Sequence, residues 1–218
     1  MGGGLVESAL RRGAGAGVRL IETLLWDGAR FPRLPLHLAR LAQGAAALGY
    51  PFDGAALRGA LAAAVGTGPL RVRLTLGAAG DAEVTVAALP PAKAEWRLGL
   101  AEGRLRSDDP WLAVKSTERA AYDAARAALP EGLDEVVFLN ERGEVCDGTI
   151  TTVFFDRGAG MRTPPLACGL LPGVLRAELA LPEEVLLAAD LPHVRLWVGN
   201  ALRGIIPAVW AGRGDDAG

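Results

Sequence analysis

The sequence predicts an α/β (α+β) protein built from two modest domains, and three observations support this fold class. The chain has 218 residues, more than a single domain usually contains. Helix-like and strand-like hydrophobic patterns occur in both halves of the chain. Between the halves lies a polar segment, GRLRSDDP, which is typical of a connection between domains.

The domain boundaries follow from these patterns. Both ends of the chain are rich in glycine, and we expect them to be disordered because such ends seldom pack against a core. The predicted parts are a disordered N-terminus at 1–17, a smaller N-terminal α/β domain at 18–103, a linker at 104–112, a C-terminal domain at 113–210 and a disordered tail at 211–218.

Two hairpins are predicted in the N-terminal half. Residues 19–26 favour a strand and precede the turn signal Asp27-Gly28, so residues 31–34 are expected to form the returning strand. A second hairpin is expected from residues 71–76 and 83–88, which flank turn-forming residues.

Two helices are predicted between these hairpins. Apolar residues recur at helical spacing over residues 38–48, and Gly49 can take the positive φ that commonly ends a helix. Arg40 therefore lies on a packed helix. Asp53 can cap the second helix, which is expected to end at Gly66.

The C-terminal half is predicted to begin with a helix and to continue mainly as strands. The helix covers residues 117–129 and ends at Pro130, which cannot continue the hydrogen-bond pattern. Residues 171–173, with the sequence LPG, lead into a short helix. Further strands are expected at 96–100, 136–140, 144–149, 151–156 and 194–198.

Composition narrows the classes of partner. A net charge of −2 provides no basic face for nucleic acid or anionic lipid. No apolar run approaches the roughly 20 residues of a membrane helix, and the N-terminus lacks the apolar core of a signal peptide. Two cysteines in a chain of this length are typical of reduced thiols, so we expect a cytoplasmic protein that acts on a small molecule.

One lysine has a sequence context that suggests chemistry. The chain has 23 basic residues, and only Lys93 and Lys115 are lysines. Lys93 lies in a Pro-rich connection, whereas Lys115 directly follows the apolar run WLAV and is expected to be partly buried. Burial lowers the pKa of an amine and leaves it nucleophilic, which arginine cannot become. The alternative is a surface lysine at a helix end.

Six segments, in order, resemble one enzyme family. They are IETLLWDG, HLARL, VKSTERAAYDAAR, ERGEVCDGTITTVFF, TPPLACGLLPGVLR and VGNALRGIIPA. Together they resemble the class IV aminotransferases and 4-amino-4-deoxychorismate lyases, from about Leu20 to Val209.

The resemblance implies fold type IV, with two α/β domains, pyridoxal 5′-phosphate in the cleft between them, and a homodimer. Lys115 matches the lysine that holds the cofactor as a Schiff base and moves protons during turnover. Arg40, in HLARL, matches the arginine that binds the phosphate, because a planar guanidinium can make two parallel hydrogen bonds to it. Otherwise Arg40 is a solvent-facing helix residue.

The resemblance also assigns the phosphate-binding loop. Leu171 would pack against the ring of the cofactor, and the main-chain N–H groups of Val174 and Leu175 would face the phosphate. A helix start after Pro-Gly suits an anion, because N–H groups and the helix dipole point towards it. Asn200 matches a polar residue that hydrogen-bonds the phosphate. Without the family, these residues are an ordinary turn and strand end.

Two positions depart from the family pattern. Asp147 stands where the family usually has a glutamate that keeps the pyridine nitrogen protonated. Thr152 stands where an asparagine is usual. Aspartate keeps the charge but is one methylene shorter, so a backbone shift, a bridging water or a weaker electron sink is expected.

The remaining reactive side chains have simpler interpretations. His37 is expected to pack or cap locally, His193 has no evident partner, and no metal site is predicted. Cys146 and Cys168 are expected to be small buried residues. Arg119 and Tyr122 follow Lys115 at helical spacing, so one helix face could present all three. Core packing for Tyr122 and a surface salt bridge for Arg119 are the alternatives.

The leading functional hypothesis is a pyridoxal-phosphate-dependent 4-amino-4-deoxychorismate lyase of folate synthesis, which forms 4-aminobenzoate and pyruvate. In it the substrate amine displaces Lys115, which then removes the ring proton. Aromatisation makes this elimination favourable even with a weaker electron sink. The carboxylates of the amine substrate need cations and polar groups. The candidates are Arg203, Thr23, Arg73 and Arg33.

Two other functions are considered. A branched-chain or D-amino-acid aminotransferase shares the first proton abstraction, but it passes through pyridoxamine phosphate. The short N-terminal region and the RVRLTL strand resemble the lyase branch more closely. A third hypothesis is a cofactor-binding homologue with little or no turnover, motivated by Asp147 and Thr152.

Overall fold

The computed structural model describes residues 3–15 and 17–212. The chain forms two compact units. The N-terminal unit extends to Pro91 and also includes Val114–Glu118, and the C-terminal unit contains Ala92–Ala113 and the chain from Arg119 onward. The boundary between the units, at Pro91, precedes the linker predicted at 104–112. The strand that begins at Trp96 belongs to the C-terminal unit and continues to Leu105, so it overlaps the start of that predicted linker.

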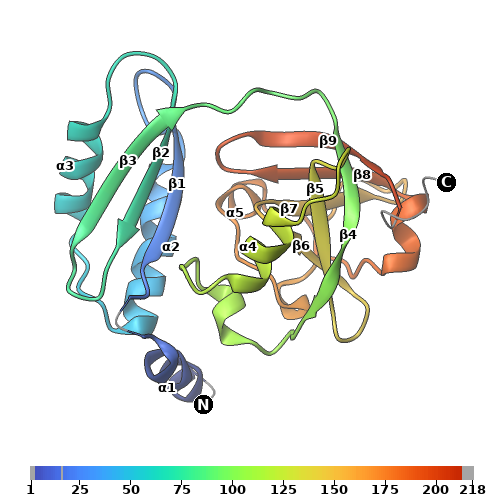
Figure 1. Cartoon of the computed structure of the whole chain (residues 1–218), viewed down its shortest axis with the longest axis horizontal. Coiled ribbons are helices and arrows are strands. Elements are labelled where there is room, and N and C mark those ends of the chain that lie inside the picture. Colours follow the sequence, from blue (N-terminus) through green and yellow to red (C-terminus); the bar gives the residue numbers. More distant parts are fainter. Residues whose placement is uncertain (1–2, 16, 213–218) are drawn as a thin grey trace. The chain divides into compact units, whose positions relative to one another are not determined.

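The N-terminal unit contains an antiparallel sheet in the order β1-β2-β3 (Figure 1). Helix α2 packs on β1, and α3 packs on β3. The predicted hairpin at 71–76 and 83–88 is confirmed as the β2–β3 pair. The elements are α1 (Gly3–Gly13), β1 (Leu20–Trp26), α2 (Leu34–Leu48), α3 (Gly54–Ala64), β2 (Leu70–Leu76) and β3 (Ala82–Ala88).

The first predicted hairpin is wrong. β1 pairs with β2, and residues 31–33 form a turn that leads into α2. Oδ1 of Asp27 accepts hydrogen bonds from the main-chain N–H groups of Ala29 and Arg30, which closes the turn locally. Pro35 lies in the first turn of α2, where the missing N–H costs nothing.

A helix lies within the N-terminal end that was predicted to be disordered. α1 buries Leu10 to 3% exposure. The guanidinium of Arg11 donates to the carbonyl oxygens of Ala46 and Ala47, at 3.0 and 3.1 Å. A cation at the end of α2 is favourable because the last carbonyl groups of a helix carry partial negative charge. Residues 1, 2 and 16 lie outside the described residues, as do residues 213–218 of the tail predicted at 211–218.

The predicted helix boundaries in this unit are largely confirmed. α2 ends at Gly49, whose φ is 76° and whose N–H contacts the carbonyls of Ala45 and Ala46. The side chain of Asp53 accepts from the N–H groups of Ala55 and Ala56 and so caps α3. α3 ends slightly before the predicted Gly66, at Ala64.

The C-terminal unit is a closed barrel in the order β4-β5-β6-β7-β8-β9, and its parallel β4–β9 pair closes it (Figure 1). β9 was not predicted from the sequence, in which 194–198 is the last expected strand. The elements are β4 (Trp96–Leu105), η1 (Pro110–Ala113), α4 (Ala120–Ala127), β5 (Glu135–Asn140), β6 (Val145–Gly148), β7 (Thr152–Asp156), η2 (Leu166–Cys168), α5 (Val174–Leu179), η3 (Ala188–His193), β8 (Arg195–Asn200) and β9 (Gly204–Trp210).

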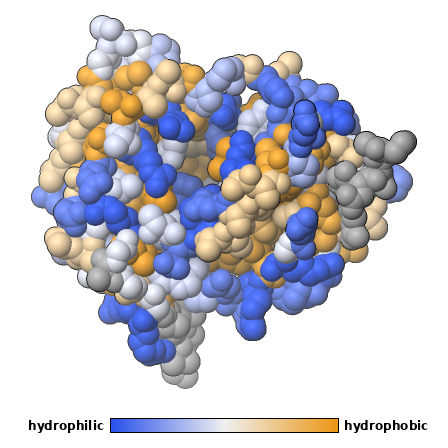
Figure 2. All heavy atoms as spheres, viewed as in Figure 1, coloured by the Kyte–Doolittle hydropathy of each residue, from blue (hydrophilic) through white to orange (hydrophobic). Residues whose placement is uncertain are grey.

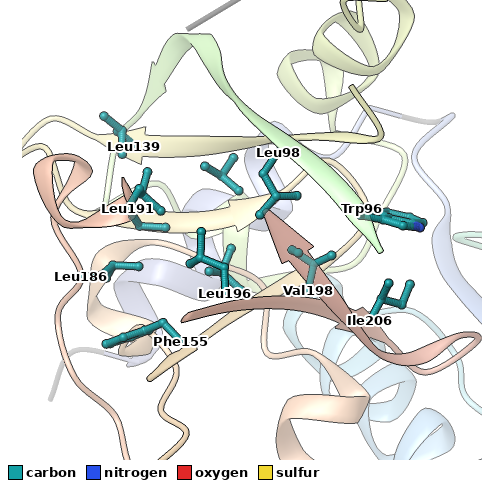
Figure 3. Close-up of a cluster of buried hydrophobic side chains, with 13 residues drawn as sticks. Trp96, Leu98, Leu139, Phe155, Leu186, Leu191, Leu196, Val198 and Ile206 are labelled. Carbon is teal, nitrogen blue, oxygen red and sulfur yellow. The ribbon is translucent and has the colours of Figure 1, made fainter. Parts of the chain in front are cut away.

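The barrel strands are buried on both faces. In β5, Val137 and Leu139 belong to one apolar cluster, whereas Val136 and Phe138 belong to another. Successive side chains of a strand point to opposite faces, so a strand with apolar residues throughout can serve two cores. Figure 3 shows the first cluster, in which Leu98, Leu196 and other side chains gather between the strands. This packing fixes β6 and β7, which carry Asp147 and Thr152.

The predicted helix at 117–129 is shorter in the structure. α4 covers Ala120–Ala127, and Arg119 is its N-cap residue. Residues Val114–Glu118 belong instead with the sheet of the N-terminal unit. The expectation that Lys115 shares a helix face with Arg119 and Tyr122 is therefore wrong.

Hydrophilic and apolar residues are interspersed on the face of each unit that Figure 2 shows. Within residues 3–15 and 17–212, no helix has both the length and the apolar character needed to cross a bilayer.

Candidate active site

Lys115 is anchored through its main chain to the edge of the N-terminal sheet. Its carbonyl oxygen accepts a hydrogen bond from the N–H of Ile21 in β1, at 2.8 Å. The next residue, Ser116, forms an antiparallel bridge with Leu20, and the N–H of Thr117 donates to the carbonyl of Arg19. The side chain of Lys115 is half-buried, in agreement with the partial burial expected from the sequence.

The pairing with β1 determines which face of the sheet Lys115 occupies. Leu20 and Val114 lie on the α2 side, because a Cβ at Gly44 of α2 would meet their side chains at 3.0 and 3.7 Å. Side chains alternate along a strand, so Lys115 belongs to the opposite face.

Two predicted substrate-binding residues share the face that carries Lys115. Thr23 of β1 is directly paired with Arg73 of β2. Thr23 is two residues from Ile21, the partner of Lys115, and therefore points to the same side of the sheet. The structure thus brings an amine, a hydroxyl and an exposed guanidinium onto one surface of this unit.

Arg40 lies on the α2 side of the same strand. Its Nε donates to Oε1 of Glu22 at 2.8 Å, and its Nη2 donates to Oε2 at 2.6 Å. Nδ1 of His37 is 2.6 Å from Oε2 of the same carboxylate. Glu22 and His37 are almost completely buried, at 1% and 2% exposure, and the Arg40 side chain is 12% exposed.

This buried carboxylate is ionised. Burial raises the pKa of Glu22, but the charge of Arg40 and the hydrogen bonds from His37 and Arg40 outweigh it and hold the pKa below its ordinary value. An ionised carboxylate is only an acceptor, so Nδ1 of His37 carries the proton in this contact. His37 therefore does pack locally as expected, but as part of a polar cluster around Arg40.

Asp147, at the end of β6, is buried to 6% exposure and accepts on both oxygens. The hydroxyl of Tyr122 donates to Oδ1 at 3.1 Å, and the main-chain N–H of Leu171 donates to Oδ2 at 3.2 Å. Burial and the neighbouring Asp147 raise the pKa of Tyr122 far above its ordinary value, so this hydroxyl remains a donor. Tyr122 also packs edge-on against Phe138, so it serves the core and the site together.

The turn after Asp147 is built on another buried carboxylate. Glu135 accepts from the hydroxyls of Thr149 and Thr151, at 2.5 and 3.0 Å, and from the N–H of Ile150 at 3.1 Å. A Cβ at Gly148 would lie 2.5 Å from Oγ1 of Thr151 and 2.8 Å from the Glu135 side chain, so only glycine fits. Glu135 thereby determines the path of the chain between β6 and β7.

The LPG segment approaches Thr152 closely. A Cβ at Gly173 would lie 2.7 Å from Oγ1 of Thr152, so the absence of a side chain there allows the loop to reach β7. Val174 and Leu175 are each 3% exposed, so their side chains point into the core of the unit. Their main-chain N–H groups open the short helix α5, and Gly173 provides no side-chain cap.

Asn200 closes the β8–β9 turn. Its Oδ1 accepts from the N–H groups of Leu202 and Arg203, and its Nδ2 donates to the carbonyl of Ile150 at 3.1 Å. This links the turn to the loop that follows Asp147. The guanidinium of Arg203 lies 5.3 Å from the centre of the Trp96 ring.

The predicted residues fall into two groups. The N-terminal unit contains Lys115, Thr23, Arg33, Arg40 and Arg73, and the C-terminal unit contains Asp147, Thr152, Leu171, Val174, Leu175, Asn200 and Arg203. Sequence reasoning missed Glu22 and Glu135. A signal was present for Glu22, since a carboxylate within the apolar strand LIETLLW must find buried partners.

Metal and thiol chemistry receive no support from the part of the chain that the structure describes. No group of three or more His, Cys, Asp or Glu side chains could hold a metal ion among these residues. Cys146 and Cys168 are free and buried. Burial and a hydrogen bond to Glu144 raise the pKa of Cys168 to about 12, which keeps it a thiol.

The fold is that of the fold-type IV pyridoxal-phosphate enzymes. The chain belongs to the amino-transferase class IV family, which matches residues 19–209. Enzymes of this family use pyridoxal phosphate, and the chain is a pyridoxal-phosphate-dependent enzyme.

Three relatives are similar over most of the chain. A Schizosaccharomyces pombe protein provisionally named an aminodeoxychorismate lyase is 35% identical over 167 residues, which are 73% of this chain and 72% of the relative. The crystal structure of a Mesorhizobium loti protein, provisionally named an amino-acid aminotransferase, is 43% identical, with a TM-score of 0.85, covering 89% of this chain and 100% of that one. The 4-amino-4-deoxychorismate lyase of Pseudomonas aeruginosa is 26% identical, with a TM-score of 0.74, covering 89% and 82%.

Proposed function

We propose that the chain is a 4-amino-4-deoxychorismate lyase that forms 4-aminobenzoate and pyruvate. The similarity to the S. pombe and P. aeruginosa proteins supports this reaction. The structural observation that carries the proposal is the shared face of Lys115, Thr23 and Arg73, because it combines a proton-transferring amine with a cation for a substrate carboxylate.

The residues proposed to hold the cofactor are Lys115 through its amine, Arg40 through its guanidinium, and the loop at Leu171, Val174 and Leu175. Asp147 and Asn200 complete this set. The residues fit the group, since Gly173 passes close to Thr152, where a Cβ would meet Oγ1 at 2.7 Å, and places no side chain over the N–H groups that open α5. When bound, pyridoxal phosphate accepts the electrons that are released as a C–H bond beside the amine breaks.

Lys115 is proposed to act as the base. Its fixed main chain holds Cα at the edge of β1, while the four-carbon stem lets Nζ move between the cofactor and the substrate. Nζ removes the ring proton next to the amine. The C–O bond to the enolpyruvyl group then breaks, the ring becomes aromatic, and the departing enolate takes up a proton at its methylene carbon to become pyruvate.

Arg73 is proposed to bind a carboxylate of the substrate, with Thr23 as a hydrogen-bond donor beside it. A guanidinium can hold a carboxylate through two parallel hydrogen bonds. Arg203 and Arg33 remain the other proposed cations for the second carboxylate.

The proposed experiment compares the purified enzyme with Lys115→Ala and the matched control Lys93→Ala. Lys93 pairs with Asp134 on the surface at 2.5 Å and lies outside the proposed site. We expect release of 4-aminobenzoate and pyruvate in equal amounts by the enzyme and by the Lys93 variant, and none by the Lys115 variant. Unchanged product release after Lys115→Ala would overturn the proposed role of Lys115.

An aminotransferase is the second candidate, supported by the 43% identity to the M. loti protein. Both functions use the same proton abstraction by Lys115. Incubation with branched-chain or D-amino acids separates them, because only an aminotransferase converts the bound cofactor to its amine form while releasing a keto acid.

We further propose that the enzyme acts in the cytoplasm as a homodimer and serves folate synthesis. The unbridged, buried cysteines agree with a reducing compartment. Light scattering of the purified protein tests the dimer, and a mass of one chain would contradict it.

A further inference from the structure

We propose that Glu22 and His37 are positioning residues that direct Arg40 towards the phosphate before the cofactor binds. This rests on the proposed function, in which Arg40 is the phosphate-binding arginine. Neither Glu22 nor His37 needs to touch the cofactor for this role.

Arg40 is held through one edge of its guanidinium. Nε and Nη2 form that edge, and both donate to Glu22, at 2.8 and 2.6 Å. A guanidinium has five N–H donors in one plane, so the bidentate contact directs the other edge, formed by Nη1 and the outer N–H of Nη2, away from Glu22. An arginine side chain has many rotamers, and a fixed plane removes most of that freedom before binding.

Glu22 can provide this support because it is itself fixed. It lies in β1 between residues that pair with β2, and its side chain is 1% exposed. His37 contacts Oε2 at 2.6 Å from the preceding turn of α2, so the carboxylate cannot rotate without losing a buried partner. His37 and Arg40 are three residues apart on α2 and therefore lie on the same helix face.

The cluster of Glu22, His37 and Arg40 affects the electrostatic attraction between Arg40 and a phosphate group. Because Glu22 is ionised, its negative charge offsets the positive charge of Arg40. Binding then depends on the directed N–H donors rather than on net charge. Replacing Glu22 by Gln would leave the charge of Arg40 uncompensated and its guanidinium plane poorly fixed. The affinity for the phosphate should therefore fall, and it should depend more strongly on salt concentration.

The experiment measures the affinity of the cofactor-free enzyme for pyridoxal 5′-phosphate and for pyridoxal, which lacks the phosphate. The ratio of the two affinities isolates the contribution of the phosphate. We expect Glu22→Gln to lower this ratio about tenfold, with little change in the affinity for pyridoxal, and to increase the salt dependence of pyridoxal 5′-phosphate binding. If Glu22 had only a structural role, the substitution would lower the affinities for both ligands equally.

Two variants of His37 keep the inference testable if Glu22→Gln does not fold. His37→Asn retains an N–H donor close to the position of Nδ1 and should keep the ratio, whereas His37→Leu removes it and should lower the ratio. The matched control is Asp81→Asn, which breaks another carboxylate–arginine pair of the same unit, Arg19–Asp81 at 2.6 Å, and should leave the ratio unchanged.

Arg40→Gln separates failure of this inference from failure of the proposed function. If Arg40→Gln lowers the ratio but neither Glu22→Gln nor His37→Leu does, the positioning role is wrong and the phosphate role of Arg40 stands. If Arg40→Gln leaves the ratio unchanged, the proposed phosphate role of Arg40 is itself wrong.

Discussion

Tyr122 and Asp147 are joined by a partly buried hydrogen bond of 3.1 Å, in which the phenol donates to Oδ1 of the carboxylate. Tyr122 comes from α4 and Asp147 from the end of β6, so the bond ties a helix to the barrel strand that carries the shorter acid. With the N–H of Leu171 on the other oxygen, the carboxylate is fixed from two sides. Asp147 is one methylene shorter than glutamate, and two hydrogen-bond donors, from Tyr122 and Leu171, hold this shorter side chain in place.

Tyr122→Phe should destabilise the protein by about 1 kcal/mol, because a buried carboxylate loses one of its donors. The ring contact with Phe138 is retained in this variant, so the effect reports the hydroxyl alone. Urea denaturation of both proteins measures the difference in the free energy of unfolding. Equal stabilities would show that the hydrogen bond contributes nothing net.

Asp147→Glu should give no gain in kcat/KM for the lyase reaction. The longer side chain has to displace the contacts with Tyr122 and Leu171, which are built for aspartate. Steady-state release of 4-aminobenzoate measures the rate. A clear increase would mean that the shorter acid limits catalysis and that these contacts do not compensate for it.

Gly173→Ala should weaken cofactor binding by about tenfold or more, because its Cβ would lie 2.7 Å from Oγ1 of Thr152 and would push the loop outward. Thr152→Ala removes that atom, so the double variant should recover part of the affinity. Titration with the cofactor measures the affinity of the unchanged protein, of Gly173→Ala and of the double variant.

Gly59→Ala is the matched control for that substitution. Gly59 lies inside α3, and a Cβ there meets nothing within 4 Å. This variant should be more stable by about 0.5–1 kcal/mol with unchanged cofactor affinity. If it weakens cofactor binding as much as Gly173→Ala does, the argument from the loop is wrong.

Arg73→Gln should raise KM for the substrate by about tenfold and leave kcat nearly unchanged, because a carboxylate loses a charge-assisted contact that it has before and during the reaction. Arg71→Gln is the matched control, since Arg71 is also exposed and points to the same face two residues along β2. A fall in kcat alone would place Arg73 in the chemical step instead.

Glu144 should make the free energy of unfolding depend on pH in the acid range. Hydrogen bonds from Arg142 and Asn140 lower its pKa from 4.5 to about 2. A group with a lowered folded-state pKa stabilises the protein above its unfolded pKa and loses that contribution as pH falls through the folded value. The contribution, about 1–2 kcal/mol after solvent screening, should be complete above pH 4.5 and should fall towards pH 2.

Glu144→Gln should lack this dependence. Unfolding free energies of both proteins between pH 7 and pH 3 would show the difference narrowing as the pH falls. A constant difference over that range would contradict the assignment of the effect to this carboxyl.

Local signals in the sequence predicted much of the fold. Gly49 and Asp53 mark helix ends because capping involves only nearby main-chain groups. The β2–β3 hairpin was predictable for the same reason. The false strand at residues 31–34 shows the limit: Asp27-Gly28 does form a turn, but the partner of β1 comes from residues about 50 positions later.

The sequence singled out the candidate site residues but not the contacts that hold them in place. Lys115 stood out as one of two lysines, and Arg40 by its place in HLARL. The face that Lys115 shares with Thr23 and Arg73 depends on pairing between segments distant in sequence. The same holds for the contacts of Glu22, Glu135 and Tyr122, since periodicity along one element does not show what packs against it.

The chain leaves the N-terminal unit at Pro91 and contributes Val114–Glu118 to it before continuing in the C-terminal unit. The two units are therefore interleaved in the gene, and no single cut separates them. A fragment ending at Pro91 would lack the segment that pairs with Leu20 and Ile21, and would expose the edge of β1 to other chains. Such a fragment should aggregate, and Lys115 would remain on the C-terminal fragment.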